Sequence, residues 1–229
     1  MPRYDTLLLD ADGTLFDFKR AEQVAFTDTF RECGFPVDED IAAMYSEINS
    51  EQWDKLERGE VTKGELVIRR FEITLQRLSI QADPREINRR YTRNLAKGNY
   101  LLPGAQEVCA DLAPHCTLIL ATNGLAQVQR ERLKSSAIAG YISDIVVSED
   151  AGAAKPEEAF FRYAFQQCGI ADKRKTLMVG DSLAADIAGG IRFGLDTCWY
   201  NPGEKTGEAL TPTYTIPRIT DLRNIVLDA

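Results

Sequence analysis

Two patterns of apolar residues alternate along the 229-residue chain. Short apolar runs that end at turn or polar residues are typical of buried parallel strands, and apolar residues spaced three or four apart are typical of amphipathic helices. The short runs predict strands at 6–9, 117–121, 145–147, 176–179, 197–200 and 214–216. The helical spacing predicts helices near 105–112, 126–136, 157–168, 184–193 and 219–227. This alternation favours an α/β fold, with a Rossmann-like parallel sheet covered by helices on both faces.

One long stretch departs from this alternation. Between about Phe18 and Lys97 the pattern is helical throughout, with four amphipathic segments and no strand pattern between them. The third segment begins at a capping box, Thr62–Glu65, and the fourth at Asp83-Pro84, with proline at the first helical position. Such helices bury their apolar faces against one another as an all-α helical bundle. We therefore expect an α/β core of residues 1–17 and 97–229 and an inserted helical unit of residues 18–96.

The composition indicates a soluble protein with an apolar core. Hydrophobic residues make up 44% of the chain and charged residues 27%, and the formal net charge is −8. This charge does not favour a nucleic acid polymer or an anionic membrane as a partner, because both require a basic face. No apolar run approaches the roughly 18 residues of a membrane span, and the first residues lack the apolar region of a signal peptide. We expect a cytoplasmic protein.

Cysteine and histidine offer little chemistry in this sequence. The five cysteines are scattered without a C-x-x-C pair, so we expect reduced and mostly buried thiols. The single histidine, His115, follows Ala113-Pro114, a position typical of a connecting loop. One histidine there leaves little for a Ser-His-Asp or Cys-His mechanism, or for a histidine-rich zinc site. Catalysis would have to use carboxylates, lysine and a hard metal ion.

Polar residues cluster after several of the predicted strands. They are Asp10-Ala11-Asp12, Thr122-Asn123-Gly124, Lys155-Pro156, and Gly180-Asp181-Ser182 with Asp186. In an open parallel sheet the ligand lies outside the carboxyl ends of the strands. Carboxylates gathered there need a compensating cation, and hard cations prefer oxygen ligands. The sequence therefore predicts a Mg²⁺ site with Asp10 and Asp181 as ligands and with Asp186 orienting Asp181.

These residues suit the hydrolysis of a phosphate ester. Asp10 can attack phosphorus and form an aspartyl-phosphate when a metal ion holds it beside the anionic ester. Asp12 can protonate the leaving oxygen and later take a proton from water. Thr122 and Asn123, at the opening of the next helix, offer donors to the phosphate, and Lys155 can stabilise its developing charge. Each motif alone also occurs in turns and helix caps, so the specificity comes from all four in order.

The four motifs resemble those of the haloacid dehalogenase-like hydrolases. The resemblance covers essentially the whole chain, including a helical cap inserted after the first motif. It implies that Asp10 is the nucleophile and Asp12 the general acid and base. It also implies that Asp10, the backbone carbonyl of Asp12 and Asp181 bind Mg²⁺. True dehalogenases replace the second acid, which is present here as Asp12, so a phosphatase is favoured over a 2-haloacid dehalogenase.

Two longer segments narrow the resemblance. Residues 145–156 and 180–202 are similar to pyrimidine 5'-nucleotidases that remove non-standard nucleoside monophosphates, although many relatives in that group carry a larger polar residue at the position of Gly13. We therefore expect a small phosphorylated metabolite as the partner, and a nucleoside 5'-monophosphate as the substrate. Trp53 and Tyr45 could stack on a base, but aromatic residues on amphipathic helices more often belong to a core.

Other functions would use the same core residues. A phosphatase of a sugar phosphate or of phosphoglycolate differs only in its helical cap, and a phosphomutase would release an isomerised phosphosugar rather than free phosphate. A fold kept only for binding would fit a chain that had lost Asp10 or Asp12, and both are present. The sequence leaves open whether the protein is a monomer or a homodimer, and whether its cap opens and closes.

Overall fold

The α/β unit is built on a sheet of six parallel strands. The computed structural model describes residues 2–204, 206 and 210–227. The strands are β1 (Thr6–Leu9), β2 (Thr117–Thr122), β3 (Asp144–Val147), β4 (Thr176–Gly180), β5 (Asp196–Tyr200) and β6 (Tyr214–Ile216). Their order in the sheet is β3-β2-β1-β4-β5-β6, and each neighbouring pair is parallel. The α/β class predicted from the sequence is confirmed.

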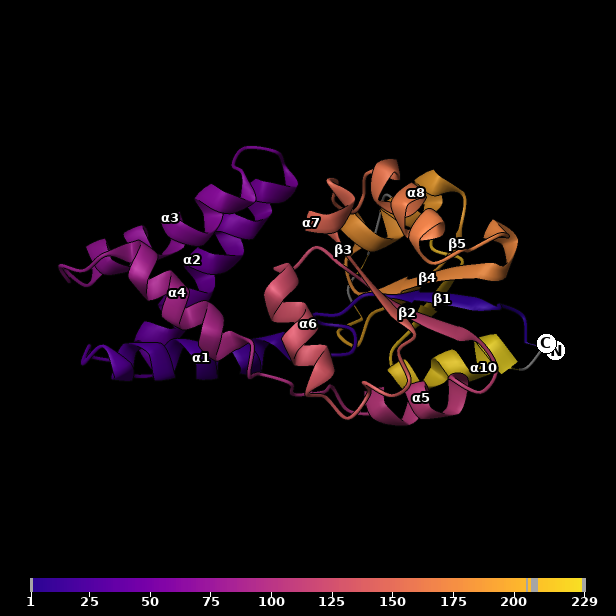
Figure 1. Ribbon diagram of the computed structural model, residues 1–229, viewed down its shortest axis with the longest axis horizontal. Helices are drawn as coiled ribbons and strands as arrows, with labels where there is room; N and C mark the ends of the chain where they lie inside the picture. The colour runs from indigo at the N-terminus through magenta and orange to yellow at the C-terminus, as the bar shows by residue number, and fades with distance from the viewer. Residues whose placement is uncertain (1, 205, 207–209, 228–229) are drawn as a thin grey trace. The chain divides into compact units, whose positions relative to one another are not determined.

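Helices cover both faces of this sheet. They are α5 (Ala105–Leu112), α6 (Ala126–Lys134), α7 (Ser148–Ala151), α8 (Glu158–Gln167), α9 (Ala188–Phe193) and α10 (Leu222–Leu227), with the shorter turns η1 (Lys173–Lys175), η2 (Leu183–Ile187) and η3 (Ile219–Asp221). Figure 1 shows α5 and α10 against one face of the sheet and α8 against the other. Leu7 and Leu9 of β1 belong to the apolar layer that includes α5 and α10. Leu8, between them, packs with Phe160 and Phe161 of α8.

Residues 19–98 form a second compact unit, separate from the unit that contains the sheet. Its helices are α1 (Phe18–Glu32), α2 (Glu39–Glu57), α3 (Lys63–Arg77) and α4 (Pro84–Leu95). The predicted capping box is present, because Oγ1 of Thr62 accepts from the N–H of Glu65 and Glu65 accepts from the N–H of Thr62. Pro84 occupies the start of α4, where its missing N–H costs no helical hydrogen bond.

Aromatic rings fill the interior of this helical unit. The ring of Tyr45 stacks on Phe26, with 4.3 Å between centroids, and on Phe71, with 5.3 Å between centroids. Tyr45 is buried, so it belongs to the core of the unit. Trp53, two turns further along α2, is partly exposed. The two aromatic residues singled out in the sequence therefore differ in what they can contact.

A chain of hydrogen bonds crosses this aromatic interior. Asn49 donates to Glu22 over 2.6 Å and accepts from Arg70 over 2.9 Å. Arg70 also donates to Asn88 and lies 4.7 Å from the centroid of the Tyr91 ring. Glu22, Asn49 and Arg70 are all buried. Asn49 thus links a buried carboxylate to a buried guanidinium and gives each a hydrogen-bond partner.

The histidine and the cysteines lie where the sequence placed them. His115 is in the turn between α5 and β2. Each cysteine is a free thiol, and Cys109, Cys116 and Cys198 are buried. Among the described helices, none combines the length and apolar character needed to span a membrane.

Candidate active site

The carboxyl ends of neighbouring strands bring the predicted residues together. Leu9 of β1 pairs with Leu120 of β2 on one side and with Val179 of β4 on the other. Asp10, directly after β1, donates its N–H to the carbonyl of Val179 over 2.9 Å. Asp181 follows β4 directly. The strand ends that carry the carboxylates therefore lie side by side at one edge of the sheet, where ligands of such sheets bind.

Lys155 lies at the centre of this group. Its Nζ donates to Oδ1 of Asp10 over 2.6 Å, to Oδ1 of Asp186 over 2.7 Å and to the carbonyl of Ala121 over 2.6 Å. An ammonium has three donors, so these contacts engage all of them. The side chains of Lys155 and Asp186 are 2% and 1% exposed, and charges attract more strongly in such an interior than in water. Lys155 thereby fixes one oxygen of Asp10.

Three carboxylates at this edge could hold a metal ion. Asp10, Asp181 and Asp186 each present an oxygen, and these oxygens lie within 4.8 Å of one another. Lys155 supplies one positive charge to the group. With the three acids ionised, the group has two negative charges in excess, which a divalent cation would balance. A donor set made only of oxygens fits Mg²⁺.

Burial changes the proton affinity of these groups. Burial raises the pKa of Asp10 to about 7, although the charge of Lys155 acts in the opposite direction. Burial and the charge of Asp10 raise the pKa of Asp181 to about 6. Burial also raises the pKa of Asp186. For Lys155, burial lowers the pKa, but Asp10 and Asp186 outweigh it, so the pKa lies above its ordinary value. Carboxyls of this kind gain most from a bound cation.

Asp12 has different neighbours from Asp10. Its Oδ1 accepts from Nη1 of Arg132 over 2.5 Å, and its Oδ2 accepts from Nε2 of Gln129 over 2.5 Å. The side chain of Asp12 is 24% exposed, against 11% for Asp10. Sequence reasoning missed Arg132 and Gln129. The sequence does show that the two residues lie three apart on a predicted helix, so that both side chains project from one face and could contact a common partner.

Thr122 and Asn123 organise the loop after β2. Oγ1 of Thr122 accepts from the N–H of Gly124 over 3.0 Å. The side-chain amide of Asn123 forms two hydrogen bonds with the backbone of Lys155. Its Nδ2 donates to the carbonyl of Lys155 and its Oδ1 accepts from the N–H of Lys155, each over 2.9 Å. Asn123 therefore positions Lys155, a role that the sequence did not indicate.

Asp181 is held by residues that are distant in the sequence. Nε1 of Trp199 donates to its backbone carbonyl over 3.0 Å. Oγ1 of Thr14 lies 3.4 Å from its Oδ1, at the long end of hydrogen bonding. Asp186, which the sequence predicts to orient Asp181, accepts from Nζ of Lys155 and from the N–H of Ser182, the residue after Asp181. Trp199 and Thr14 are thus further contributors to the position of Asp181 that the sequence analysis did not find.

Gly13 lies directly against Asp181. Its backbone φ is +89°, in the left-handed region that favours glycine. A Cβ at this position would lie 2.5 Å from Oδ2 of Asp181. A side chain here would displace the carboxylate in this conformation, so the absence of a side chain at Gly13 is part of the geometry of this site.

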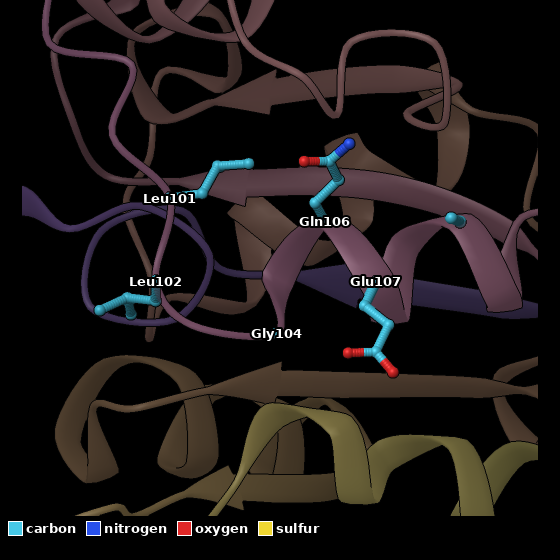
Figure 2. Close-up of a pocket in the computed structure, with 6 residues that line it drawn as sticks. Leu101, Leu102, Gly104, Gln106 and Glu107 are labelled. Atoms are coloured by element: carbon cyan, nitrogen blue, oxygen red, sulfur yellow. The ribbon is translucent and has the colours of Figure 1, made fainter.

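A surface depression in the same unit lies apart from these residues. It has a volume of about 480 Å³ and is shown in Figure 2. Its lining residues are Leu101, Leu102, Gly104, Gln106, Glu107 and Ala110. Figure 2 shows Gln106 and Glu107 projecting from α5. None of the strand-end residues lines it, so the candidate site is the polar edge of the sheet.

Comparison with known proteins agrees with this geometry. A family model described as haloacid dehalogenase-like hydrolase matches residues 4–194. The chain belongs to this family. The HAD-hydrolase YfnB of Bacillus subtilis is 38% identical over 227 residues, which cover 99% of this chain and 97% of YfnB. A crystal structure of YfnB bound to magnesium matches with a TM-score of 0.92, covering 97% of this chain and 98% of that one.

Two further relatives are named for a nucleotidase activity. The pyrimidine 5'-nucleotidase PynA of Streptococcus pneumoniae is 36% identical and covers 96% of this chain and 93% of the relative. The pyrimidine 5'-nucleotidase YjjG of Escherichia coli is 31% identical and covers 98% of both chains. The predicted family and enzyme class, a phosphoric monoester hydrolase of the haloacid dehalogenase-like kind, are confirmed.

Proposed function

We propose that the chain is a Mg²⁺-dependent phosphatase that hydrolyses a nucleoside 5'-monophosphate through an aspartyl-phosphate on Asp10. The observation that carries this proposal is the contact of Lys155 with Asp10 and Asp186 beside Asp181. Lys155 fixes the carboxylate of Asp10 in place. The three carboxylates together have more negative charge than Lys155 balances, and a divalent cation would compensate the excess. The likeness to two pyrimidine 5'-nucleotidases over nearly their full lengths supports the substrate class.

In the first half-reaction, a carboxylate oxygen of Asp10 forms a bond to phosphorus, and the bond from phosphorus to the leaving oxygen breaks. Lys155 holds Oδ1 of Asp10, so the carboxylate does not have to be oriented during the reaction. Its charge also lies beside the reacting centre and stabilises the negative charge that develops there. Asp12 donates a proton to the leaving oxygen, and the alcohol departs.

In the second half-reaction, a water molecule attacks phosphorus. Asp12, now ionised, takes a proton from the water as the new bond forms. The bond between phosphorus and Asp10 breaks, which releases inorganic phosphate and restores the free carboxylate of Asp10. Asp12 can serve both steps because the water enters where the leaving group departed. We expect Thr122, at the end of β2, and Asn123, directly after it, to face the phosphate oxygens.

The metal ion has its own set of proposed ligands. The carboxylates of Asp10 and Asp181 and the backbone carbonyl of Asp12 would hold Mg²⁺. Asp186 would act indirectly, because it accepts a hydrogen bond from Lys155, which also holds Asp10. The ion, when bound, offsets the charges of ester and carboxylate that otherwise repel each other. The raised pKa values of Asp10 and Asp181 support a cation at this place.

We also propose that residues 18–96 act as a cap that selects the leaving group and that residues 1–17 and 97–229 form the catalytic core. Tyr45 is enclosed in the interior of the helical unit. Trp53 is partly exposed and is therefore the better candidate for stacking on a base.

A panel of phosphorylated metabolites with Mg²⁺ tests the proposal. It should contain pyrimidine and purine 5'-nucleotides, sugar phosphates and phosphoglycolate, with release of inorganic phosphate as the signal. The highest kcat/KM is expected for a nucleotide. Turnover of sugar phosphates or phosphoglycolate alone would contradict the substrate class, and an isomerised phosphosugar would indicate a mutase. Asp10→Asn should abolish turnover while the protein stays folded, and retained activity would exclude Asp10 as the nucleophile.

A further inference from the structure

Two donors from one helix hold the carboxylate of Asp12. Arg132 and Gln129 lie three residues apart on α6, so their side chains project from the same face. One donates to Oδ1 of Asp12 and the other to Oδ2, each over 2.5 Å. A carboxylate gripped at both oxygens by two different residues cannot rotate about its Cβ–Cγ bond without breaking one of the contacts. We call these two residues the Asp12 clamp.

Both members of the Asp12 clamp are enclosed by the protein. Arg132 is fully buried and Gln129 is 1% exposed. The guanidinium of Arg132 lies 4.7 Å from the centroid of the Phe16 ring, in the same segment as Asp12. A buried guanidinium loses its hydration, which destabilises the folded state unless the group is paired. The pairing with Asp12 compensates this cost, and the packing limits where Asp12 can be held.

The loop after β2 leaves room for this arrangement. A Cβ on Gly124 would lie 2.2 Å from Nε2 of Gln129 and 2.9 Å from its Cγ. The absence of a side chain at Gly124 therefore lets Gln129 pass close to the backbone on its way to Asp12. Thr122, the last residue of β2, lies directly before this loop and accepts from the N–H of Gly124. The chain that follows β2 thus supplies both the proposed phosphate loop and the donors to Asp12.

We infer that Arg132 and Gln129 are positioning residues for proton transfer by Asp12, an inference that rests on the proposed function. An ionised carboxylate offers about four lone-pair sites, and the Asp12 clamp occupies one on each oxygen. In the ionised form, a remaining site can receive a proton from a water molecule. Once protonated at such a site, the carboxyl can donate that proton to a leaving oxygen. Without the clamp the carboxylate samples other orientations, and the fraction aligned for transfer falls.

The leaving group separates this role from a structural one. An alkyl phosphate such as a nucleotide needs a proton on its leaving oxygen, because an alkoxide is a poor leaving group. The 2,4-dinitrophenolate ion is stable without that proton. The ratio kcat/KM reports on the steps from free enzyme and substrate up to the transfer of the phosphoryl group to Asp10. Loss of proton donation should therefore lower kcat/KM for the alkyl ester and spare the dinitrophenyl ester.

The experiment measures kcat/KM with Mg²⁺ for 2,4-dinitrophenyl phosphate and for the alkyl phosphate that the unaltered protein hydrolyses best. Arg132→Met should lower the alkyl value about 100-fold and Gln129→Met about 10-fold, with changes below about threefold for the dinitrophenyl ester. Arg132→Lys keeps a cation near Asp12 and should recover part of the alkyl activity. Arg130 lies on the same helix as the Asp12 clamp and forms an exposed ion pair with Asp150 of α7, so Arg130→Met is the matched control and should resemble the unaltered protein.

Equal losses on both esters would overturn the inference, because a structural defect does not distinguish leaving groups. Unchanged kinetics in Gln129→Met and Arg132→Met would overturn it as well. If Arg132→Met does not fold, Gln129→Met decides alone, since it removes one amide and keeps a chain of similar length. Asp12→Asn should show the same difference between the esters. If kcat/KM for the two esters responds differently in Asp12→Asn but equally in the clamp variants, the inference about Arg132 and Gln129 is rejected and the role of Asp12 stands. If the two esters respond equally in Asp12→Asn, the proposed role of Asp12 is rejected, and the inference with it.

Discussion

Nζ of Lys155 lies 2.6 Å from Oδ1 of Asp10, and the two side chains are only 2% and 11% exposed. Burial disfavours the charged form of each group taken alone. The ion pair opposes this effect in both groups, although the pKa of Asp10 stays raised, and Asp186 adds a second carboxylate 2.7 Å from the ammonium. The same lysine therefore favours the charged form of the proposed nucleophile and stabilises the sheet edge around it.

Replacing this lysine should affect activity and stability together. Lys155→Met is expected to lower kcat at least about 100-fold, because the charge beside the reacting phosphate is lost. It should also lower the free energy of unfolding by about 3 kcal/mol, because Asp10 and Asp186 lose their cation in the interior. Phosphate release at saturating Mg²⁺ and denaturant unfolding measure the two effects. Lys134→Met, at an exposed lysine of α6, is the control, and full activity in Lys155→Met would contradict the proposal.

The raised pKa values predict how the metal-free protein responds to pH. The pKa of Asp10 is about 7 and that of Asp181 about 6, against an ordinary value of 3.8 for both. The folded state binds these protons more tightly than the unfolded state, so the stabilisation is complete below the ordinary pKa and is lost as pH rises through 6 and 7. In EDTA, these two groups should lower Tm between about pH 5 and about pH 8.

Added Mg²⁺ should reverse this loss. Protons and the ion compete for the same carboxylates, so Mg²⁺ should raise Tm more at about pH 8 than at about pH 5. Calorimetric scans in EDTA and in Mg²⁺ at both pH values provide the measurement. Asp181→Asn removes one of the ligands and should reduce the effect of Mg²⁺ at the higher pH. An equal effect of Mg²⁺ at both pH values in the unaltered protein would contradict metal binding at these carboxyls.

The fold could be predicted where its signals are local. The apolar run of Thr6–Leu9, the capping box at Thr62 and the proline at the start of α4 each specify an element within a few residues. The sequence pattern predicts only an ordinary helix near 184–193, so the π-helical form of η2 (Leu183–Ile187) could not be predicted. There the carbonyl of Ser182 accepts from the N–H groups of both Asp186 and Ile187, and the side chain of Asp186 bends back to the N–H of Ser182. These contacts depend on the surrounding packing.

The candidate site divides in the same way. Parallel topology places every strand end at one edge, so Asp10 and Asp181 could be found from their positions after apolar runs. Arg132 and Gln129 lie in a polar helix in which each side chain resembles a solvated one. Trp199 resembles an ordinary strand residue, and its contact with Asp181 depends on the pairing of β4 with β5, which the sequence pattern does not specify.

Trp199 should tune the affinity for the metal ion. The register of β4 and β5 pairs Trp199 with Gly180, which directs the indole N–H to the carbonyl of Asp181. Trp199→Phe keeps most of the apolar packing and removes the donor. The Mg²⁺ concentration for half-maximal activity should rise about 10-fold, with a smaller change in kcat at saturating Mg²⁺. Titration of phosphate release with Mg²⁺ measures this, with Tyr163→Phe on α8 as the control. An unchanged titration would show that the contact does not influence the metal site.

The hydrogen bonds of Asn49 should contribute measurably to the stability of the helical unit. Asn49→Leu removes the donor to Glu22 and the acceptor from Arg70, and leaves two buried charged groups with fewer partners. The free energy of unfolding should fall by about 3 kcal/mol. Ser46→Ala removes only the other 2.6 Å hydrogen bond to Glu22, so it should cost about 1 kcal/mol.

Urea unfolding of the full chain, followed by fluorescence of Trp53 in a Trp199→Phe background, reports on this unit. A third variant separates the hydrogen bonds from the packing around them. When Glu22→Leu and Arg70→Met accompany Asn49→Leu, no buried charge is left without a partner, and most of the lost stability should return. If the triple variant is less stable than Asn49→Leu alone, the ionic groups contribute more than their desolvation costs, and the buried chain from Glu22 to Arg70 stabilises the unit in its own right.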